Sequence, residues 1–183
     1  KIKKKKKYQI YPSFWNIELA KKITKNKKAD LIYSANTLSH IKNFNEIFKA
    51  IKYSLSSKGI LVLEDPSLLE CLKKVAYDQF YCEHLYVFST ISLQKILDKF
   101  DLEIFDIENI STHGGSNRYF IKKKQNKFYN IKKKVKDEIN KELRYGLNHF
   151  ATYERFARKV KLSKIKLLNI FRKIKNQKKK IVG

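Results

Sequence analysis

Two short apolar runs with a helical stretch between them organise the first third of the chain. The runs are residues 30–35 and 59–63, and between them apolar residues recur at helical spacing, at Phe44, Ile47, Phe48, Ile51 and Leu55. This order predicts a β-α-β unit, in which two parallel strands are joined by a right-handed crossover. Ligands bind outside the carboxyl ends of such strands. Residues 36–40 and 64–66 follow the two runs, which places Asn36 and His40 at a candidate site. Without further support, a turn residue and a helix-terminal residue explain them equally well.

The pattern on either side predicts further helices and one strand pair. Ser13 or Asn16 is expected to cap a helix that runs to about Thr24, and residues 68–75 are expected to be helical. Ser89 or Thr90 is expected to cap another helix. Residues 102–110 and 119–121 are then expected to be paired strands around a loop formed by residues 113–118.

The last third of the chain predicts long basic helices broken near Gly146. An apolar stripe in the second of them indicates packing against a neighbouring domain, and its members are Phe156, Val160, Leu168, Phe171 and Ile174. A basic helix lying on a membrane surface is the alternative.

Charge changes this picture less than its size suggests. The 183 residues carry a formal net charge of +25, which would ordinarily favour nucleic-acid or anionic-membrane binding. Lys, Ile and Asn are over-used along the whole chain, however, and Lys greatly outnumbers Arg, the residue that reads bases and phosphates bidentately. We therefore expect no specific nucleic-acid binding. The Lys-rich segment Lys1–Lys7 is expected to be solvated.

Cysteine usage and hydropathy predict a cytoplasmic, reduced protein without a membrane span. Cys71 and Cys82 form no C-x-x-C and no metal-ligand spacing, and no apolar run approaches 18 residues. The chain contains no Met, and residues 180–183 resemble the start of a new strand. Both observations favour an internal fragment of a longer protein.

Candidate chemistry is concentrated in residues 77–84, which bring Tyr81, Glu83 and His84 together. An imidazole beside a phenol and a carboxylate suits proton transfer near neutral pH. Taken alone, the cluster is more often a polar network at a helix end. A second stretch, His113, Gly114, Gly115, Ser116, Asn117 and Arg118, could bring backbone N–H groups and a guanidinium to a phosphate.

Taken in order, four motifs resemble the second half of an S-adenosylmethionine-dependent sugar C-methyltransferase. They are residues 29–40, residues 59–66, Tyr81-Cys-Glu-His84 and His113-Gly-Gly-Ser-Asn-Arg118. The nearest type methylates nucleotide-linked 4-keto-deoxysugars at C3. The resemblance is close over residues 12–122 and loose over residues 123–183. It implies an α/β fold, namely the later half of a class I (Rossmann-like) methyltransferase sheet, followed by long C-terminal helices.

The resemblance also implies a mechanism. A base removes the C3 proton that the neighbouring ketone acidifies, and the enolate then takes the methyl group of S-adenosylmethionine. By analogy His84 is the base, Tyr81 and Glu83 support it, and His40 lines the reacting centre. Asn36 lies on the cofactor side, while His113, Gly114, Gly115, Ser116 and Arg118 bind the nucleotide-sugar substrate.

The chain departs from the family in three respects. Cys82 stands where the family usually has His between the Tyr and the Glu, which puts the tuning of the base in doubt. A role for Cys82 as a nucleophile finds no support in its neighbours. The family's glycine-rich cofactor loop is missing from the sequence, as is its N-terminal zinc-binding domain, so any zinc is expected only in that domain.

The expected organisation is a partial methyltransferase domain in residues 1–122 and a basic helical linker in residues 123–183 that leads into a C-terminal domain. The fragment alone is expected to be inactive. Two other functions stay open, a different small-molecule methyltransferase on the same fold and a basic nucleic-acid-binding module.

Overall fold

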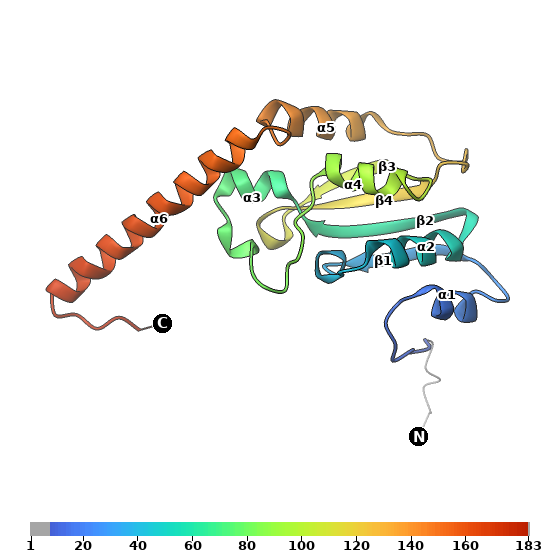
Figure 1. Cartoon of the computed structure of the whole chain (residues 1–183), viewed down its shortest axis with the longest axis horizontal. Helices are drawn as coiled ribbons and strands as arrows, with labels where there is room; N and C mark the ends of the chain where they lie inside the picture. Colours follow the sequence, from blue (N-terminus) through green and yellow to red (C-terminus); the bar gives the residue numbers. More distant parts are fainter. Residues whose placement is uncertain (1–7, 183) are drawn as a thin grey trace, which may run out of the picture.

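A computed structural model describes residues 8–182, so the predicted solvated segment Lys1–Lys7 lies outside the described residues. The fold centres on a four-stranded mixed sheet in the order β1-β2-β4-β3 (Figure 1). The strands are β1 (Ala29–Ala35), β2 (Leu55–Pro66), β3 (Leu102–Ile110) and β4 (Ser116–Lys123). β1 and β2 are parallel, whereas β4 runs antiparallel to both β2 and β3. The predicted parallel pair and the predicted antiparallel pair are both confirmed.

Polar side chains begin several of the helices. Asn16 caps α1 (Ile17–Ile23) and Asn43 caps α2 (Phe44–Ser54), each by accepting a backbone N–H bond. Ser67 caps α3 (Leu68–Lys74) in the same way, and Ser89 and Ser92 form a reciprocal capping box at α4 (Thr90–Asp98). The remaining elements are α5 (Lys133–Tyr145), α6 (Phe150–Asn176) and three short 3-10 turns, η1 (Leu38–His40), η2 (Tyr77–Gln79) and η3 (Thr112–Gly114).

The core lies between one face of the sheet and helices α2 and α4. The inward side chains of β2 and β4 include Leu61, Leu63, Tyr119 and Ile121, all nearly fully buried. They pack in one cluster with Phe48 and Ile51 of α2 and with Leu93 and Leu97 of α4. Burial of these apolar side chains fixes the register of the sheet, because a shift by one residue would turn every one of them outward.

The opposite face of the sheet is partly open at β1, which forms one edge of the sheet. Leu31 and Tyr33 of β1 are each 59% exposed. Register pairing places Tyr33 beside Val62 of β2, so both belong to this second face. The same face carries the ion pair between Glu64 and Arg118.

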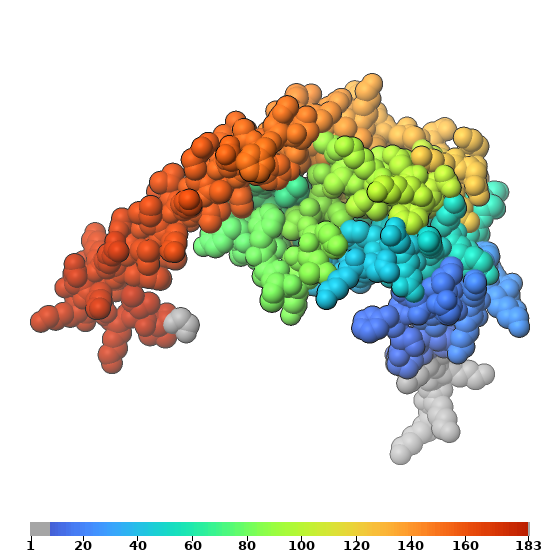
Figure 2. All heavy atoms as spheres, viewed as in Figure 1, coloured from blue at the N-terminus to red at the C-terminus, as the bar shows by residue number. Residues whose placement is uncertain are grey.

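The C-terminal helices are joined to the sheet by α5 and then depart from it. The carboxylate of Glu142 on α5 accepts the backbone N–H groups of Thr90 (2.7 Å) and Ile91 (3.0 Å) at the start of α4. Gly146 ends α5 in the left-handed conformation, with φ 90°, which confirms the predicted break. α6 then extends away from the sheet, and its far half stands clear of the rest of the molecule (Figures 1 and 2).

The near end of α6 packs against α3 and the segment that follows it. Phe156 lies 5.7 Å, between ring centroids, from Phe80, and it joins a small cluster with Leu69 and Leu72. Beyond this contact most large apolar side chains of α6 are exposed, among them Leu162, Ile165, Leu167, Ile170 and Phe171, while Val160 and Ile174 are partly buried. Within residues 8–182, no helix combines the length and the apolar character needed to cross a bilayer.

Candidate active site

The carboxyl ends of β1 and β2 lie side by side and carry the first two predicted residues. Asn36 follows β1 directly, adopts a left-handed conformation with φ 49°, and donates its N–H to the carbonyl of Glu64 (2.8 Å). Its exposed side chain stands at this edge. His40 ends η1 four residues later, and its side chain is also exposed. The β-α-β reasoning therefore placed Asn36 and His40 at the same sheet edge correctly.

His84 is held by one hydrogen bond at each ring nitrogen. Nδ1 lies 2.8 Å from the backbone carbonyl of Gln79, and Nε2 lies 2.9 Å from the hydroxyl of Tyr81. A carbonyl can only accept, so Nδ1 must carry a proton. In the neutral ring Nε2 is then the unprotonated nitrogen and accepts from the hydroxyl of Tyr81. This arrangement selects Nε2 as the basic atom of His84.

His40 and His84 meet edge to face, although 44 positions separate them in the sequence. Their ring centroids lie 4.9 Å apart at an interplanar angle of 64°. Tyr81 packs against His84, and the centroids of these two rings lie 4.1 Å apart. The structure thus brings three of the four residues predicted to be catalytic into one cluster.

The fourth residue, Glu83, is not part of this cluster in the described residues. Its side chain is exposed, and it makes no hydrogen bond or ion pair with His84 there. Support of the imidazole by Glu83 therefore stays a prediction. The support that the structure does show comes from the carbonyl of Gln79, which sequence reasoning missed because a backbone carbonyl leaves no residue-type signal.

Sequence reasoning also missed a buried carboxylate beneath the histidine pair. Asp65 is 1% exposed and accepts the backbone N–H of Ser39 at 3.4 Å. Burial raises the pKa of Asp65 to about 6, against the opposing effects of Ser39 and His40. The sequence signal was an Asp directly after an apolar strand, in Glu64-Asp65-Pro66. These residues were predicted only to mark the end of that strand.

The second predicted stretch is not the open loop that the pattern suggested. β4 begins at Ser116, so Ser116 and Arg118 lie within a strand, and only residues 111–115 form the turn. Ser116 is buried and donates its hydroxyl to the carbonyl of Thr112 (2.9 Å). The strand starts earlier than expected because β4 pairs on both sides, through Pro66↔Ser116 and Ile110↔Ser116.

Gly115 lets this turn approach α3 closely. Gly115 has φ 135°, and a Cβ built on it would lie 2.8 Å from the Cβ of Glu70. The carbonyl of Gly115 accepts the N–H of Ser67 (3.0 Å), and Lys74 donates its ammonium to the carbonyl of Gly114. His113 is exposed. Among the described residues, no hydrogen bond or ring contact joins residues 113–118 to His40 or His84.

Arg118 is already engaged by two carboxylates across the sheet. Its Nε lies 2.5 Å from Oε1 of Glu64 on β2, and its Nη1 lies 3.1 Å from Oε2 of Glu108 on β3. The pairs raise the pKa of the Arg118 guanidinium above its usual value, and its hydrogen bond with Glu64 is the largest cause. Two negative charges on one positive charge leave this group net negative, so a phosphate would meet repulsion as well as attraction.

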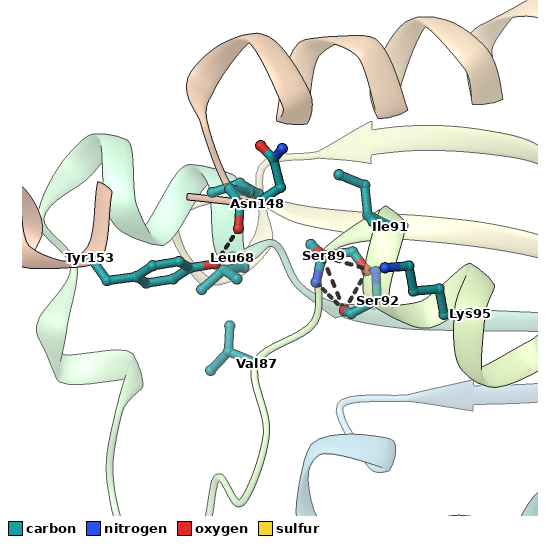
Figure 3. A pocket seen from close by; sticks show the side chains of 9 residues that line it. Leu68, Val87, Ser89, Ile91, Ser92, Lys95, Asn148 and Tyr153 are labelled. Atoms are coloured by element: carbon teal, nitrogen blue, oxygen red, sulfur yellow. Dashed lines mark hydrogen bonds between the residues drawn. The ribbon is translucent and has the colours of Figure 1, made fainter. Parts of the chain in front are cut away.

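Two hollows lie in this part of the molecule. Of the predicted site residues, only His40 lines one of them. One of about 430 Å³ adjoins His40 and is lined by Trp15, Thr37, Asn43, Glu46 and neighbouring side chains. Another of about 380 Å³ lies between α4 and the turn from α5 to α6 (Figure 3). In the second, the N–H groups of Thr90, Ile91 and Ser92 are occupied by Glu142 and Ser89, which leaves no open anion site at that helix end.

No group of three or more His, Cys, Asp or Glu side chains with the geometry of a metal site occurs within residues 8–182.

Family comparisons divide the chain in two. A family described as "Methyltransferase domain" matches residues 3–107, and a family described as "C-methyltransferase C-terminal domain" matches residues 111–183. C-methyltransferase NovU from Streptomyces niveus is 28% identical over 109 residues, a match that covers 59% of this chain and 26% of that protein. The match thus spans about a quarter of the length of this curated relative.

Solved structures of limited similarity include two methyltransferases. A SAM-dependent methyltransferase from Anabaena variabilis has a TM-score of 0.42 and 17% sequence identity, covering 60% of this chain and 55% of that chain. Magnesium protoporphyrin IX methyltransferase (ChlM) from Synechocystis PCC 6803, with bound SAH, has a TM-score of 0.34 and 23% identity, covering 51% and 44%.

Proposed function

This chain belongs to the family described as "Methyltransferase domain", which matches residues 3–107, and we propose that it takes part in an S-adenosylmethionine-dependent C-methylation. The mixed sheet and the helical C-terminus agree with the expected fold class, the later half of a class I methyltransferase sheet. The acceptor in this proposal is a nucleotide-linked keto-deoxysugar, methylated at C3. The match of residues 111–183 to a C-methyltransferase C-terminal domain and the similarity to NovU favour carbon as the methylated atom.

The observation that carries the proposal is the fixed tautomer of His84. Methylation at a neutral amine or an already ionised oxygen needs little more than positioning, whereas methylation at a carbon next to a ketone needs a base to remove the C–H proton. The carbonyl of Gln79 holds the proton on Nδ1, so that Nε2 is the ring nitrogen with a lone pair, which the hydroxyl of Tyr81 engages in this structure.

In the proposed reaction, His84 Nε2 accepts the C3 proton and the ring becomes an imidazolium. The hydroxyl of Tyr81 donates to Nε2 in this structure and must release it before proton transfer. The same hydroxyl can then donate to the oxygen at C4, where negative charge develops in the enolate. The His40 ring lies beside that of His84, and it is proposed to restrict how the sugar approaches the base.

S-adenosylmethionine supplies an electrophilic methyl group when it is bound. Of the cofactor site, this chain provides one wall at most, because its sequence contains no G-x-G-x-G loop. Asn36 is the proposed cofactor-side residue, since its exposed side chain follows β1 on the same edge as His40. The left-handed backbone at Asn36 turns the chain sharply at this point, which positions the amide beside the strand end.

The nucleotide-sugar is proposed to extend from His84 toward the turn formed by residues 111–115, which packs against α3. His113, Gly114, Gly115, Ser116 and Arg118 keep their proposed substrate-side roles, although they differ in availability. His113 is exposed, whereas the hydroxyl of Ser116 and the guanidinium of Arg118 already have protein partners. Contact with substrate through Arg118 therefore requires an exchange of ion-pair partners.

For domain organisation, we propose a partial methyltransferase domain in residues 1–122 and a helical linker in residues 123–183. The C-methyltransferase C-terminal match begins earlier, at residue 111. Packing favours the later boundary, because β4 pairs along its length with both β2 and β3 and so belongs to the sheet.

The test is deuterium exchange at C3 of a nucleotide-linked 4-keto-deoxysugar in heavy water, with the full-length protein. Exchange that needs His84 but no methyl donor would show proton abstraction separately from methyl transfer. Methylation without any such exchange would favour a different small-molecule methyltransferase on the same fold. Sequence-selective binding to nucleic acid at physiological salt would favour a basic binding module instead.

A further inference from the structure

Asp65 is a buried carboxyl that the proposed reaction does not use. It lies near the carboxyl end of β2, is 1% exposed, and stands opposite the neutral Asn117 in the β2–β4 pairing. One of its oxygens, Oδ2, is buried without a hydrogen-bond partner among the described residues. Such a group is costly to bury, so its position needs a physical reason.

Ser39 connects Asp65 to both histidines. The backbone N–H of Ser39 donates to Oδ1 of Asp65 (3.4 Å), and the carbonyl of Ser39 accepts the N–H of Leu85 (2.9 Å). Ser39 immediately precedes His40, and Leu85 immediately follows His84. Two consecutive hydrogen bonds therefore tie β2, η1 and the His84 segment together at the point where the rings meet.

The hydrogen bonds of Ser39 join the two segments that carry the histidine rings. His40 and His84 come from separate segments and share no hydrogen bond among the described residues, so their 4.9 Å contact depends on how the two backbones are held. The Ser39–Leu85 bond joins those backbones one residue away from each ring. The buried Asp65 in turn holds Ser39 by accepting its backbone N–H.

Burial is the largest influence on Asp65 and raises its pKa, whereas the hydrogen bonds from Ser39 and the nearby His40 of η1 lower it. Glu64, the neighbour of Asp65 on β2, points to the other face of the sheet, where it pairs with Arg118. Asp65 therefore lies on the side of the Ser39–His40 turn, away from the Glu64–Arg118 pair.

We infer that Asp65 is a positioning residue, which acts through Ser39 and Leu85 to set the separation of the His40 and His84 rings. The inference rests on the proposed function for its catalytic consequence. Displacement of a catalytic group by about 1 Å can cost on the order of 10²-fold in rate. Loss of the Asp65 acceptor should therefore lower turnover while the binding of substrate is largely unchanged.

The experiment compares two substitutions in the full-length protein. Asp65→Asn keeps an oxygen that can accept the Ser39 N–H but never ionises, whereas Asp65→Ala removes the acceptor. Asp30→Asn, at an exposed carboxyl of β1, is the matched control. Asp65→Ala should reduce both C3 exchange and kcat by about 10²-fold with little change in KM. Asp65→Asn should stay within about threefold of the unsubstituted protein, as should the control.

A second measurement does not depend on activity. Nuclear Overhauser contacts between the ring protons of His40 and His84 should be present in the unsubstituted protein and in Asp65→Asn, and absent or weaker in Asp65→Ala. If Asp65→Ala does not fold, Asp65→Leu refills the space and takes its place. Unchanged kcat and unchanged ring contacts in the folded Ala or Leu variant would overturn the inference. If the unsubstituted protein exchanges no C3 proton at all, the proposed function fails, and the ring contacts alone decide the positioning role.

Discussion

Glu64 and Arg118 face each other across β2 and β4, with 2.5 Å between Oε1 and Nε. Glu64 is 8% exposed and has Arg118 as its ion-pair partner, while Arg118 also reaches Glu108 on β3. This arrangement gives Arg118 a structural role that its place in a Gly-Gly-Ser-Asn-Arg motif did not suggest. The effect of substituting Arg118 on stability can therefore be measured separately from its effect on substrate binding.

The first prediction concerns Arg118. Arg118→Ala leaves Glu64 buried without its partner, so the melting temperature should fall. Arg118→Lys keeps one positive charge but loses the two-way fork, and it should recover only part of that stability. If Arg118 also binds the nucleotide-sugar, both variants should raise KM more than they lower kcat. Thermal melts and steady-state kinetics measure the two effects, and an effect confined to kcat would remove Arg118 from substrate binding.

His84 is the residue whose loss should matter most for chemistry. His84→Ala should reduce C3 exchange and methylation together, by the roughly 10²–10⁴-fold typical of a positioned general base. Cys82→Ala is the matched control, because Cys82 is exposed and forms no hydrogen bond with the imidazole among the described residues. Glu83→Gln should fall between the two if the carboxylate supports the imidazolium. Near-normal methylation by the His84 variant together with an inactive His40→Ala variant would assign the base to His40 instead.

Asp65 should give the protein a stability that decreases as pH rises. Its pKa is raised from its usual 3.8 to about 6 in the folded state, so folding favours the protonated form. The stabilisation is complete below the unfolded pKa and is lost as pH rises through about 6. The difference of about 2 pKa units corresponds to at most about 3 kcal/mol.

Asp65→Asn isolates this contribution because the amide stays neutral at every pH. The melting temperature of the variant relative to the unsubstituted protein should increase between about pH 4 and pH 6 and then level off. Comparison of the two proteins at each pH cancels the effects of all other carboxyls. A difference that does not change with pH would show that Asp65 does not titrate in this range.

Glu142 should be the main polar attachment of the C-terminal helices to the sheet domain. Its carboxylate is 0% exposed and accepts two N–H groups at the start of α4. Glu142→Ala leaves both donors without a partner and should cost about 1–3 kcal/mol of unfolding free energy. Glu142→Gln keeps one acceptor oxygen and should cost less. Chemical denaturation measures both, and Glu154→Ala on the exposed side of α6 is the control.

The turn between α5 and α6 depends on the left-handed conformation of Gly146. At φ 90° a Cβ would lie 2.8 Å from Oγ1 of Thr152. Gly146→Ala should therefore lower the unfolding free energy by about 1–2 kcal/mol. Gly114→Ala is a useful comparison, since it shares a positive φ but has open space around the new Cβ. An equal loss in the two variants would show that backbone strain, and not the Thr152 contact, is responsible.

Local patterns in the amino-acid sequence were enough to predict most helices and strands and their order. Apolar periodicity predicted β1, α2 and β2 as a parallel unit, and capping residues such as Asn16 and Ser89 marked where helices begin. Gly146 marked the break between the two C-terminal helices. These features are local. A capping side chain bonds to a backbone N–H two or three residues away, and apolar residues repeat every 2.0 residues in strands and every 3.6 residues in helices.

Which side chains and backbone groups meet depends on contacts between segments that are distant in the sequence. The edge contact of His40 with His84, the carbonyl of Gln79 on Nδ1 and the buried Asp65 beneath Ser39 all arise from backbone positions that no residue type announces. The same is true of Arg118, which read as part of a loop but lies in β4 between two carboxylates. Pairing of β4 with strands on both sides extended it to Ser116, because each added residue gains hydrogen bonds to two neighbours.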